Sequence, residues 1–269
     1  MSVPVELARV EASLRATAAV GSVVHAVWAL ARAQLPRIEE AVAQATEYLD
    51  WVDEVVERLA GPPVTVEGAA PLTVLIGPER AFCGRLARTV LEHAPADGAL
   101  GLVGTRLAEV ASREPALSGR VAFAIGAADS IDGLGAAAQR LARALLEHLE
   151  GTPVALTHPR GARGRMHRVD LLALAREGGA ADHDLYSSPA RVLRDAVHES
   201  LEGRLRIALA ESLRAEVRAR LMATERARRA VDERRDVLER ARRVGEQEQV
   251  TRELLELIAA GLSGPPGSG

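Results

Sequence analysis

The residues best suited to chemistry lie in one loop, Gly77 to Gly84, which follows a predicted buried strand. Parallel α/β folds bind ligands at the loops that follow their strands. Cys83 is expected to open the next helix, where the helix dipole could lower the pKa of its thiol and make it a nucleophile. The alternative is a small, buried packing residue. The loop lacks the G-x-G-x-x-G spacing that lets backbone amides approach a pyrophosphate, which argues against a dinucleotide site.

The other polar residues do not have the spacing of a catalytic or metal site. All 34 basic residues are Arg, so the chain has no Walker A loop and no Schiff-base lysine. The seven His residues include no H-E-x-x-H pair, and Asp182–Asp184 is better explained as a helix cap. Asp129–Gly133 is only partly similar to a calcium loop and is expected to be a turn. We therefore expect no catalytic residue, no cofactor and no metal ligand here.

Composition narrows the choice of partner and compartment. The 37 acidic residues leave a net charge of -3, which argues against a dedicated nucleic-acid binder. A single Cys excludes an internal disulfide and makes a reducing compartment the default. The longest uncharged run, Ala16–Ala31, is shorter than the roughly 18 to 20 apolar residues that a bilayer span needs. We expect a soluble, cytosolic protein with no direct membrane insertion.

A heptad pattern predicts one long helix at the N-terminus. Between Leu7 and Leu59, apolar residues recur at alternating steps of three and four, and fourteen of the sixteen positions are apolar. The positions are Leu7, Val10, Leu14, Thr17, Gly21, Val24, Trp28, Ala31, Leu35, Ile38, Val42, Ala45, Leu49, Val52, Val56 and Leu59. A sustained 3.5-residue repeat is typical of a left-handed coiled coil. At 1.5 Å per residue this helix is about 80 Å long, so it needs an equally long partner.

The partner is predicted at the other end of the chain. Ser187–Pro189 is a helix start signal, and no further Pro occurs before Pro265. A weaker second seam is predicted at Ala223, Ala227, Ala230, Arg234, Val237, Ala241, Val244, Glu248, Thr251, Leu255, Ile258 and Leu262. The strongly charged outer face of this helix is either a solvated face with pairs four residues apart or a docking surface for an acidic partner. Gly261–Gly269 is expected to be a flexible tail.

The middle of the chain has the pattern of an α/β domain. Strands are predicted at Leu72–Ile76, Leu100–Val103, Val121–Ile125, Val154–Thr157 and Val169–Leu174, and helices at Cys83–Ala94, Thr105–Ser112 and Gly133–Glu150. Alternating strands and helices predict a parallel, Rossmann-like sheet covered on both faces, and the last two strands, joined without a helix, predict a hairpin at its edge. The expected domains are residues 1–62 (long helix), 63–184 (α/β domain), 185–262 (long helix) and 263–269 (tail).

This order, an α/β domain inserted between two helices of an antiparallel coiled coil, resembles the gamma subunit of F-type ATP synthases. Four stretches carry the resemblance: Glu11–Leu14 with Thr17 is similar to the family's I-A-S-V, Glu79–Gly84 to D-R-G-L-C-G, Leu185–Pro189 to L-Y-E-P-x-P, and Gln247 with Val250–Ile258 to R-Q-x-x-I-T-Q-E-L-x-E-I. Their order and spacing together cover about residues 5–260.

The resemblance implies a rotor. The paired helices would form the central shaft in the catalytic head, and the α/β domain would form its foot. The implied partners are the alpha and beta subunits of the head, the epsilon subunit and the membrane ring of c subunits, on the cytoplasmic face of the cell membrane. ATP chemistry would belong to those partners, which would make this chain non-catalytic. Partner contacts are implied for Arg80, Cys83, Gln247, Thr251 and Glu253.

Some residues depart from the family pattern. Val20–Ala31 replaces the Met- and Lys-bearing signature, Glu246 replaces an Arg, and Arg85 replaces the second Gly of the loop. Pro36 lies inside the first long helix, where it removes a hydrogen bond and is expected to produce a kink. These departures leave open a divergent or paralogous rotary ATPase. Two alternatives of other classes also stay open: a structural scaffold of the same shape that does not rotate, and a small α/β enzyme that uses Cys83 or Arg80 and dimerises through its helices.

Overall fold

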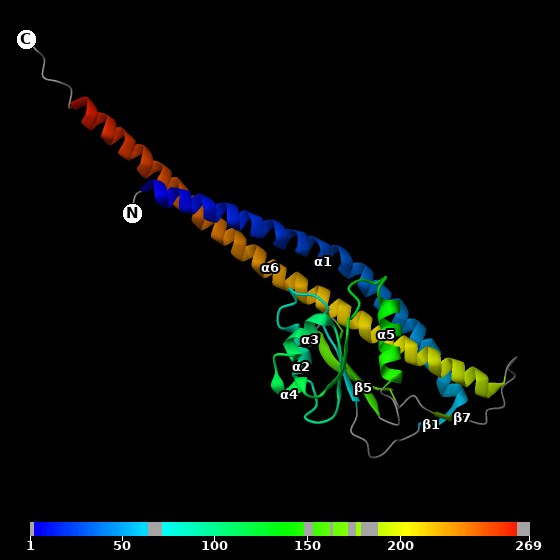
Figure 1. Ribbon diagram of the computed structural model, residues 1–269. Coiled ribbons are helices and arrows are strands. Elements are labelled where there is room, and N and C mark those ends of the chain that lie inside the picture. Colours follow the sequence, from blue (N-terminus) through cyan, green and yellow to red (C-terminus); the bar gives the residue numbers. More distant parts are fainter. Residues whose placement is uncertain are drawn as a thin grey trace, which may run out of the picture. The chain divides into compact units, whose positions relative to one another are not determined.

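The computed structural model describes residues 3–63, 72–147, 153–161, 164–171, 176–178 and 188–262 (Figure 1). The chain divides into two compact units. Unit 1 comprises Met1–Ala29 with Thr224–Gly269, and unit 2 comprises Leu30–Ala223. Two long helices, α1 (Val3–Leu59) and α6 (Pro189–Leu262), contribute residues to both units. The predicted arrangement of two long helices around an inserted α/β domain is confirmed.

The central sheet of unit 2 has the strand order β4-β3-β2-β5-β6. Its strands are β2 (Leu72–Ile76), β3 (Leu100–Val103), β4 (Val121–Ile125), β5 (Val154–Arg160) and β6 (Arg165–Asp170). The first four pair in parallel, whereas β6 pairs antiparallel with β5 at the edge, so the predicted hairpin is confirmed. A second sheet, in which β1 (Ala60–Pro63) pairs with β7 (Arg176–Gly178), was not predicted.

Helices cover both faces of the sheet. They are α2 (Leu86–Leu91), α3 (Thr105–Ala111), the short α4 (Pro115–Ser118) and α5 (Leu134–Leu146). Because side chains alternate along a strand, Leu75 of β2 packs with α2 and α3, while Val74 and Ile76 pack with α5 and α6. This two-sided burial explains why β2 is an uninterrupted apolar run.

Some predictions differ from the structure or fall outside it. The helix expected from Cys83 begins only at Leu86, because Phe82 and Gly84 have φ angles of 64° and 60° that no α-helix accepts. The last predicted strand lies earlier, at β6. Asp182–Asp184, residues 148–150 and 172–174, and the tail 263–269 lie outside the described residues.

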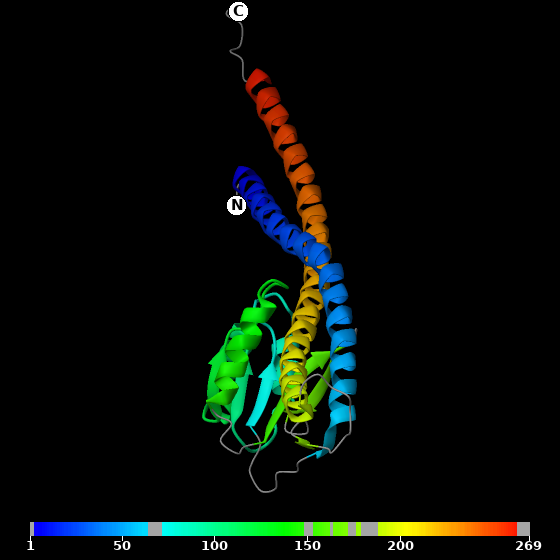
Figure 2. The same cartoon turned by 90° about the vertical axis from the view of Figure 1, so that its right-hand side faces the viewer.

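In unit 2, α1 and α6 pack side by side and antiparallel (Figure 2). The seam predicted on α1 is confirmed here, since seven of its positions are buried: Ala31, Ile38, Val42, Leu49, Val52, Val56 and Leu59. On α6 the facing residues include Ala210, Leu213 and Val217. The helix α1 continues through Pro36 without interruption.

In unit 1, the same two helices form a pair by themselves, so their seam is only half-buried. Antiparallel contact is shown by Gly21, where an added Cβ would lie 3.1 Å from Val231, and by Gly245, where it would lie 3.3 Å from Leu7. The seam on α6 therefore passes through Val231, Leu238 and Gly245, one residue after the positions predicted for this region. The predicted seam residues Val237 and Val244 are about half exposed instead.

The exclusion of a membrane span by length was too strict. The helix α1 holds an 18-residue window that is long and apolar enough to cross a membrane by length and composition, and 6% of that window is buried. One such helix near the N-terminus is weak evidence, because core helices and signal sequences have the same composition. The window nevertheless shows that α1 has an apolar stretch that the rest of the chain leaves mostly unburied.

Candidate partner interfaces

The loop from Gly77 to Arg85, between β2 and α2, is held in a fixed shape by one carboxylate. The Glu79 side chain accepts hydrogen bonds from the Thr105 amide (2.9 Å), the Thr105 hydroxyl (2.6 Å) and the Ala127 amide (2.7 Å). Thr105 begins α3, whose N-terminus favours a negative charge. Glu79 thus ties together the loops that follow β2, β3 and β4.

The backbone of Gly104, just before α3, lies very close to the backbone of the same loop. Gly104 has a φ of 123°, and a Cβ there would lie 2.6 Å from the Gly77 carbonyl oxygen and 2.7 Å from that of Pro78. Only glycine fits these two constraints together. This position was not singled out in the sequence, although a Gly between a strand and a helix is the usual sign of such an approach.

Arg80, an expected contact residue, lies exposed on the loop and pairs with Asp129, which follows β4. The hydrogen bond from Arg80 lowers the pKa of the Asp129 carboxyl. Asp129 is therefore engaged by a cation of the chain itself, which agrees with a turn rather than a calcium loop at this place.

Cys83, the second expected contact, is 4% exposed and lies before α2 rather than within it. Its Sγ lies 3.5 Å from the Arg80 carbonyl oxygen. Burial raises the pKa of the thiol, which agrees with a packing residue and not with a nucleophile activated by the helix dipole. Within the described ranges, no His, Asp or Glu side chain is hydrogen-bonded to Cys83, so the geometry lacks the base that nucleophilic catalysis needs.

The outward surface of the loop is formed instead by its neighbour Phe82. This side chain is 64% exposed, and its backbone is in the left-handed region that a non-glycine residue rarely adopts. Such conformations persist where the surrounding structure imposes them, and they concentrate at functional sites. Sequence reasoning missed Phe82. The available signal was a large aromatic residue at a loop tip, in a chain with only two Phe.

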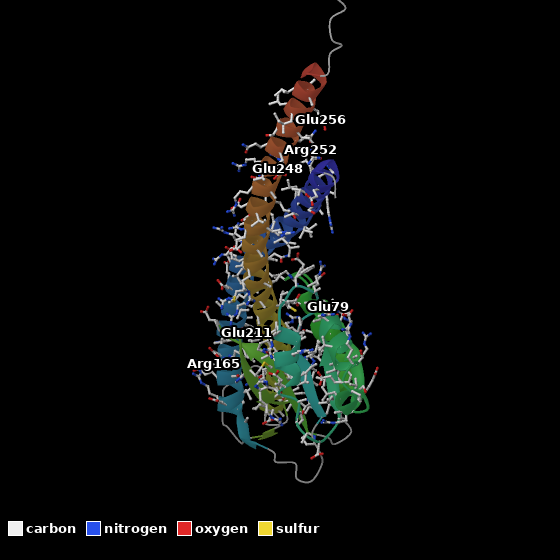
Figure 3. The ribbon with its side chains drawn as sticks, turned by 90° about the vertical axis from the view of Figure 1, so that its left-hand side faces the viewer. Glu79, Arg165, Glu211, Glu248, Arg252 and Glu256 are labelled. Atoms are coloured by element: carbon white, nitrogen blue, oxygen red, sulfur yellow. The ribbon has the colours of Figure 1, made fainter. Side chains whose placement is uncertain are left out.

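The three remaining expected contacts lie in the C-terminal part of α6 in unit 1, the stretch on which Figure 3 labels Glu248, Arg252 and Glu256. Gln247, Thr251 and Glu253 are all exposed. The Thr251 hydroxyl donates to the Gln247 carbonyl oxygen (2.9 Å), and Glu253 accepts from the Gln249 side chain (2.9 Å). Large apolar residues among and after them are also exposed: Val250, Leu254, Leu255, Leu257 and Ile258.

The charged face of α6 in unit 1 is occupied by its own ion pairs. Arg235 donates to Glu239 (2.8 Å), Arg229 lies 3.5 Å from Glu225, and each pair spans four residues of the helix. This geometry fits the first of the two explanations given for the face, a solvated surface with local pairs.

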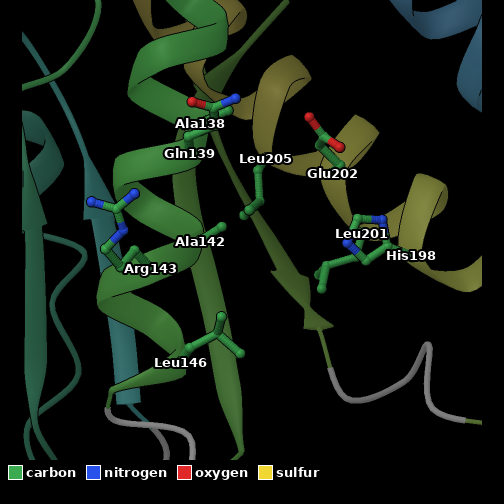
Figure 4. A pocket seen from close by; sticks show the side chains of 9 residues that line it. All are labelled: Ala138, Gln139, Ala142, Arg143, Leu146, His198, Leu201, Glu202 and Leu205. Atoms are coloured by element: carbon green, nitrogen blue, oxygen red, sulfur yellow. The ribbon is translucent and has the colours of Figure 1, made fainter.

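One open groove of about 350 Å³ lies between α5 and α6 in unit 2 (Figure 4). At its α6 side, His198, Glu199 and Glu202 bring three metal-ligand atoms within 4.8 Å of one another. Glu199 already accepts from the Tyr48 hydroxyl (3.3 Å), Glu202 pairs with Arg206 (2.6 Å), and all three residues are at least partly exposed. We assign no metal to this cluster, because surface carboxylates with partners of their own are common without one.

An α/β domain inserted between two long helices that pair antiparallel is the architecture that the structure defines. The family model described as ATP synthase matches residues 6–263. The chain therefore belongs to the ATP synthase gamma-subunit family, whose members are central rotor subunits of F-type ATP synthases.

Solved structures with the same fold agree with this assignment. A chain from the rotor of the Euglena gracilis mitochondrial ATP synthase has a TM-score of 0.62 at 14% identity, covering 91% of this chain and 99% of that one. A chain from the OSCP/F1/c-ring structure of the same enzyme has a TM-score of 0.65 at 15% identity, with 98% of both chains covered. A chain from the central stalk and c-ring of the Tetrahymena thermophila mitochondrial ATP synthase has a TM-score of 0.54 at 15% identity, covering 76% and 99%. The search of curated proteins gives no match.

Proposed function

We propose that this chain turns as the central shaft of an F-type ATP synthase and has no catalytic site of its own. The observation that carries the proposal is the antiparallel helix pair of unit 1, whose seam is half-buried and which exposes large apolar side chains besides the charged face of α6. Its exposed large side chains include Val20, Val23, Val237, Val244, Leu254, Leu255, Leu257 and Ile258. Extensive exposed apolar surface marks a face that a partner protein covers.

The partner that fits this pair is the catalytic head of alpha and beta subunits. Gln247, Thr251 and Glu253 would then face head loops, and the apolar window of α1 would be covered by protein rather than lipid. In unit 2, the loop that carries Arg80 and the buried Cys83 would contact a partner through Phe82. The α/β domain would meet the epsilon subunit and the ring of c subunits.

A gamma-family subunit belongs to a membrane-associated complex. We place the chain on the cytoplasmic face of the membrane, peripheral to it, because the single unpaired cysteine suits a reducing compartment. ATP binding and hydrolysis would belong to the head subunits, in keeping with a chain that has no Lys for a phosphate loop.

Co-expression with alpha and beta subunits from the same source tests this function. The expected result is a stable complex whose ATPase activity depends on this chain and in which a bead attached to the chain rotates during hydrolysis. A stable complex without rotation would indicate the scaffold. A soluble homodimer with an activity of its own that Cys83→Ser abolishes would indicate the enzyme.

A further inference from the structure

The linkage between α6 and the sheet of unit 2 is made by a carboxylate that is almost completely buried. Glu216 is 2% exposed, and its two oxygens accept the backbone amides of Glu79 (2.8 Å) and Arg80 (3.1 Å). Arg220, one turn later and 8% exposed, pairs with the same carboxylate, and its Nε lies 3.5 Å from the Ala81 carbonyl oxygen. Two side chains of α6 thus hold backbone groups of three successive residues of one loop.

The loop that Glu216 and Arg220 hold is itself hydrogen-bonded to other parts of the α/β domain. It is the loop in which Glu79 binds Thr105 at the start of α3 and Ala127 after β4. A displacement of α6 at Glu216 therefore acts on the carboxyl ends of three neighbouring strands through directional, charge-assisted hydrogen bonds. Apolar packing between α6 and the sheet has no such directionality.

A second buried carboxylate of α6 holds another loop in the same way. Glu211 is 5% exposed, accepts the Gly161 amide (3.2 Å) in the turn between β5 and β6, and pairs with Arg214. Figure 3 shows Glu211 on α6 and Glu79 in the α/β domain. The polar contacts of α1, by contrast, include Glu39 with Arg218 and Asp53 with Arg204, which join α1 to α6.

We propose that Glu216, supported by Arg220, is the positioning residue through which torque passes between the shaft helix α6 and the α/β domain. The proposal rests on the proposed rotor function and adds to it the place of mechanical coupling. A rotor whose foot is driven by the ring must turn its shaft by the same angle. Rigid attachment of the domain to α6 at Glu216 provides this, and α1 follows because it is paired with α6.

The test uses Glu216→Gln, which preserves size but removes the charge. Its matched control is Glu202→Gln, which breaks another Glu–Arg pair four residues apart on the same helix, with the 2.6 Å contact to Arg206, but holds no loop. The first readout is amide exchange in the full-length free subunit. We expect the Glu79 and Arg80 amides to exchange at least tenfold faster in Glu216→Gln, and at the wild-type rate in the control.

The second readout is ATP-driven ion pumping by the complete complex in vesicles, divided by its ATP hydrolysis rate. We expect this ratio to fall at least threefold in Glu216→Gln and to stay at the wild-type value in the control. Both are measured at a temperature where the assembled complexes are intact, because loss of one charge of a buried ion pair also lowers the melting temperature. If Glu216→Gln does not fold, Glu216→Met with Arg220→Met keeps the volume without the bonds and takes its place.

The outcomes distinguish a failure of the Glu216 linkage from a failure of the rotor function. A wild-type complex that pumps, together with a Glu216 variant that pumps equally well or keeps slow exchange at Glu79 and Arg80, overturns the linkage but leaves the rotor function standing. A wild-type complex that assembles without pumping overturns the rotor function and the linkage with it. Equal losses in Glu216→Gln and Glu202→Gln would mean that any lost charge on α6 has this effect, which also overturns the proposal.

Discussion

Trp28 of α1 lies beneath the guanidinium group of Arg228 of α6, with the Arg228 Cζ 4.7 Å from the centre of the indole ring. The two residues are 200 positions apart in the chain, and their contact closes the antiparallel pair of unit 1. It also confirms the expectation that the N-terminal seam meets the C-terminal helix. A cation held over an aromatic face attracts the ring quadrupole, so this contact contributes more than apolar packing.

We expect Arg228→Gln to lower the free energy of unfolding by about 0.5–1 kcal/mol, because the cation–π contact at this partly exposed site is lost. Arg228→Lys should restore part of it. The measurement is urea unfolding followed by Trp fluorescence and by circular dichroism. Arg229→Gln is the control, since Arg229 lies at the same distance from Glu225 but is not over the ring. Equal effects of the two Gln variants would attribute the loss to the Glu225 pair instead.

We expect two Gly→Ala substitutions in unit 2, at Gly104 and at Gly135, to have opposite effects on the stability of the protein. Gly104→Ala should destabilise the protein by at least about 2 kcal/mol, because it adds a Cβ 2.6 Å from a carbonyl oxygen at a positive φ. Gly135→Ala should stabilise it by about 0.5 kcal/mol, since Gly135 lies in α5 with open space around its Cα. Thermal unfolding of both variants measures the difference. A tolerated Gly104→Ala would contradict the close approach on which the loop geometry depends.

His158 makes the stability of unit 2 depend on pH. It is 2% exposed, and burial lowers its pKa from 6.5 to about 4. Above pH 6.5 both the folded and the unfolded states are neutral at this residue, so it adds no pH dependence. Between pH 6.5 and 4 only the unfolded state binds the proton, so the free energy of unfolding should fall by about 3 kcal/mol as the pH is lowered. Below pH 4 the effect levels off, because the folded state also binds the proton.

Urea unfolding at a series of pH values checks this expectation. His158→Leu should remove most of that decrease, whereas His93→Gln, at an exposed histidine, should keep it. His167 packs edge-on against His158, and its pKa is also lowered, chiefly by burial, so a smaller residual slope of the same sign is expected in His158→Leu. An unchanged slope in His158→Leu would show that other groups cause the decrease.

Cys83 should behave as an unreactive thiol. With 4% exposure and a raised pKa, it should be alkylated by iodoacetamide at pH 7.5 at least tenfold more slowly in the folded protein than in urea. Cys83→Ser should keep the ATPase activity of the assembled complex, because a hydroxyl fits the same space and can donate to the Arg80 carbonyl. Rapid labelling of the folded protein, or loss of turnover in an intact complex, would favour the enzyme alternative.

The sequence was sufficient where a pattern repeats over many residues. Sixteen seam positions fixed the register of α1, and alternation of apolar strands with helical stretches fixed the sheet and its hairpin. The register on α6 was misassigned by one residue in unit 1 because each predicted seam residue has a small or apolar neighbour that fits the same repeat. Val237 precedes the buried Leu238, and Val244 precedes Gly245, which lies against Leu7, so the hydropathy pattern alone could not choose between the two seams.

The hydrogen bonds from loop amides to Glu211 and Glu216 could not be predicted from the sequence, and the reason is a different one. In a helix rich in Arg and Glu, the sequence around Glu211 and Glu216 looks like that around Glu202, which is a surface residue. What distinguishes the buried carboxylates is the loop backbone that reaches them, from a residue 50 positions earlier for Glu211 and 137 positions earlier for Glu216. Local spacing carries no information about such contacts.

Gln247 and Glu253 provide the test of the C-terminal contacts. Both are exposed, and the contact from Gln249 to Glu253 is a surface hydrogen bond, so Gln247→Leu with Glu253→Leu should change the free energy of unfolding by less than about 0.5 kcal/mol. In the complex, however, the variant should lower the ratio of rotation or pumping to ATP hydrolysis, because partner loops that bind an amide and a carboxylate in the wild-type protein would face apolar side chains in the variant.

The control is Glu248→Leu with Glu256→Leu, which makes the same segment equally apolar at two positions not implied as contacts. The measurements are coupling in the reconstituted complex and thermal unfolding of the free subunit. Unchanged coupling in the first variant would mean that these side chains are solvated in the complex, and equal losses in both would mean that any added apolar surface on the last turns of α6 impairs rotation.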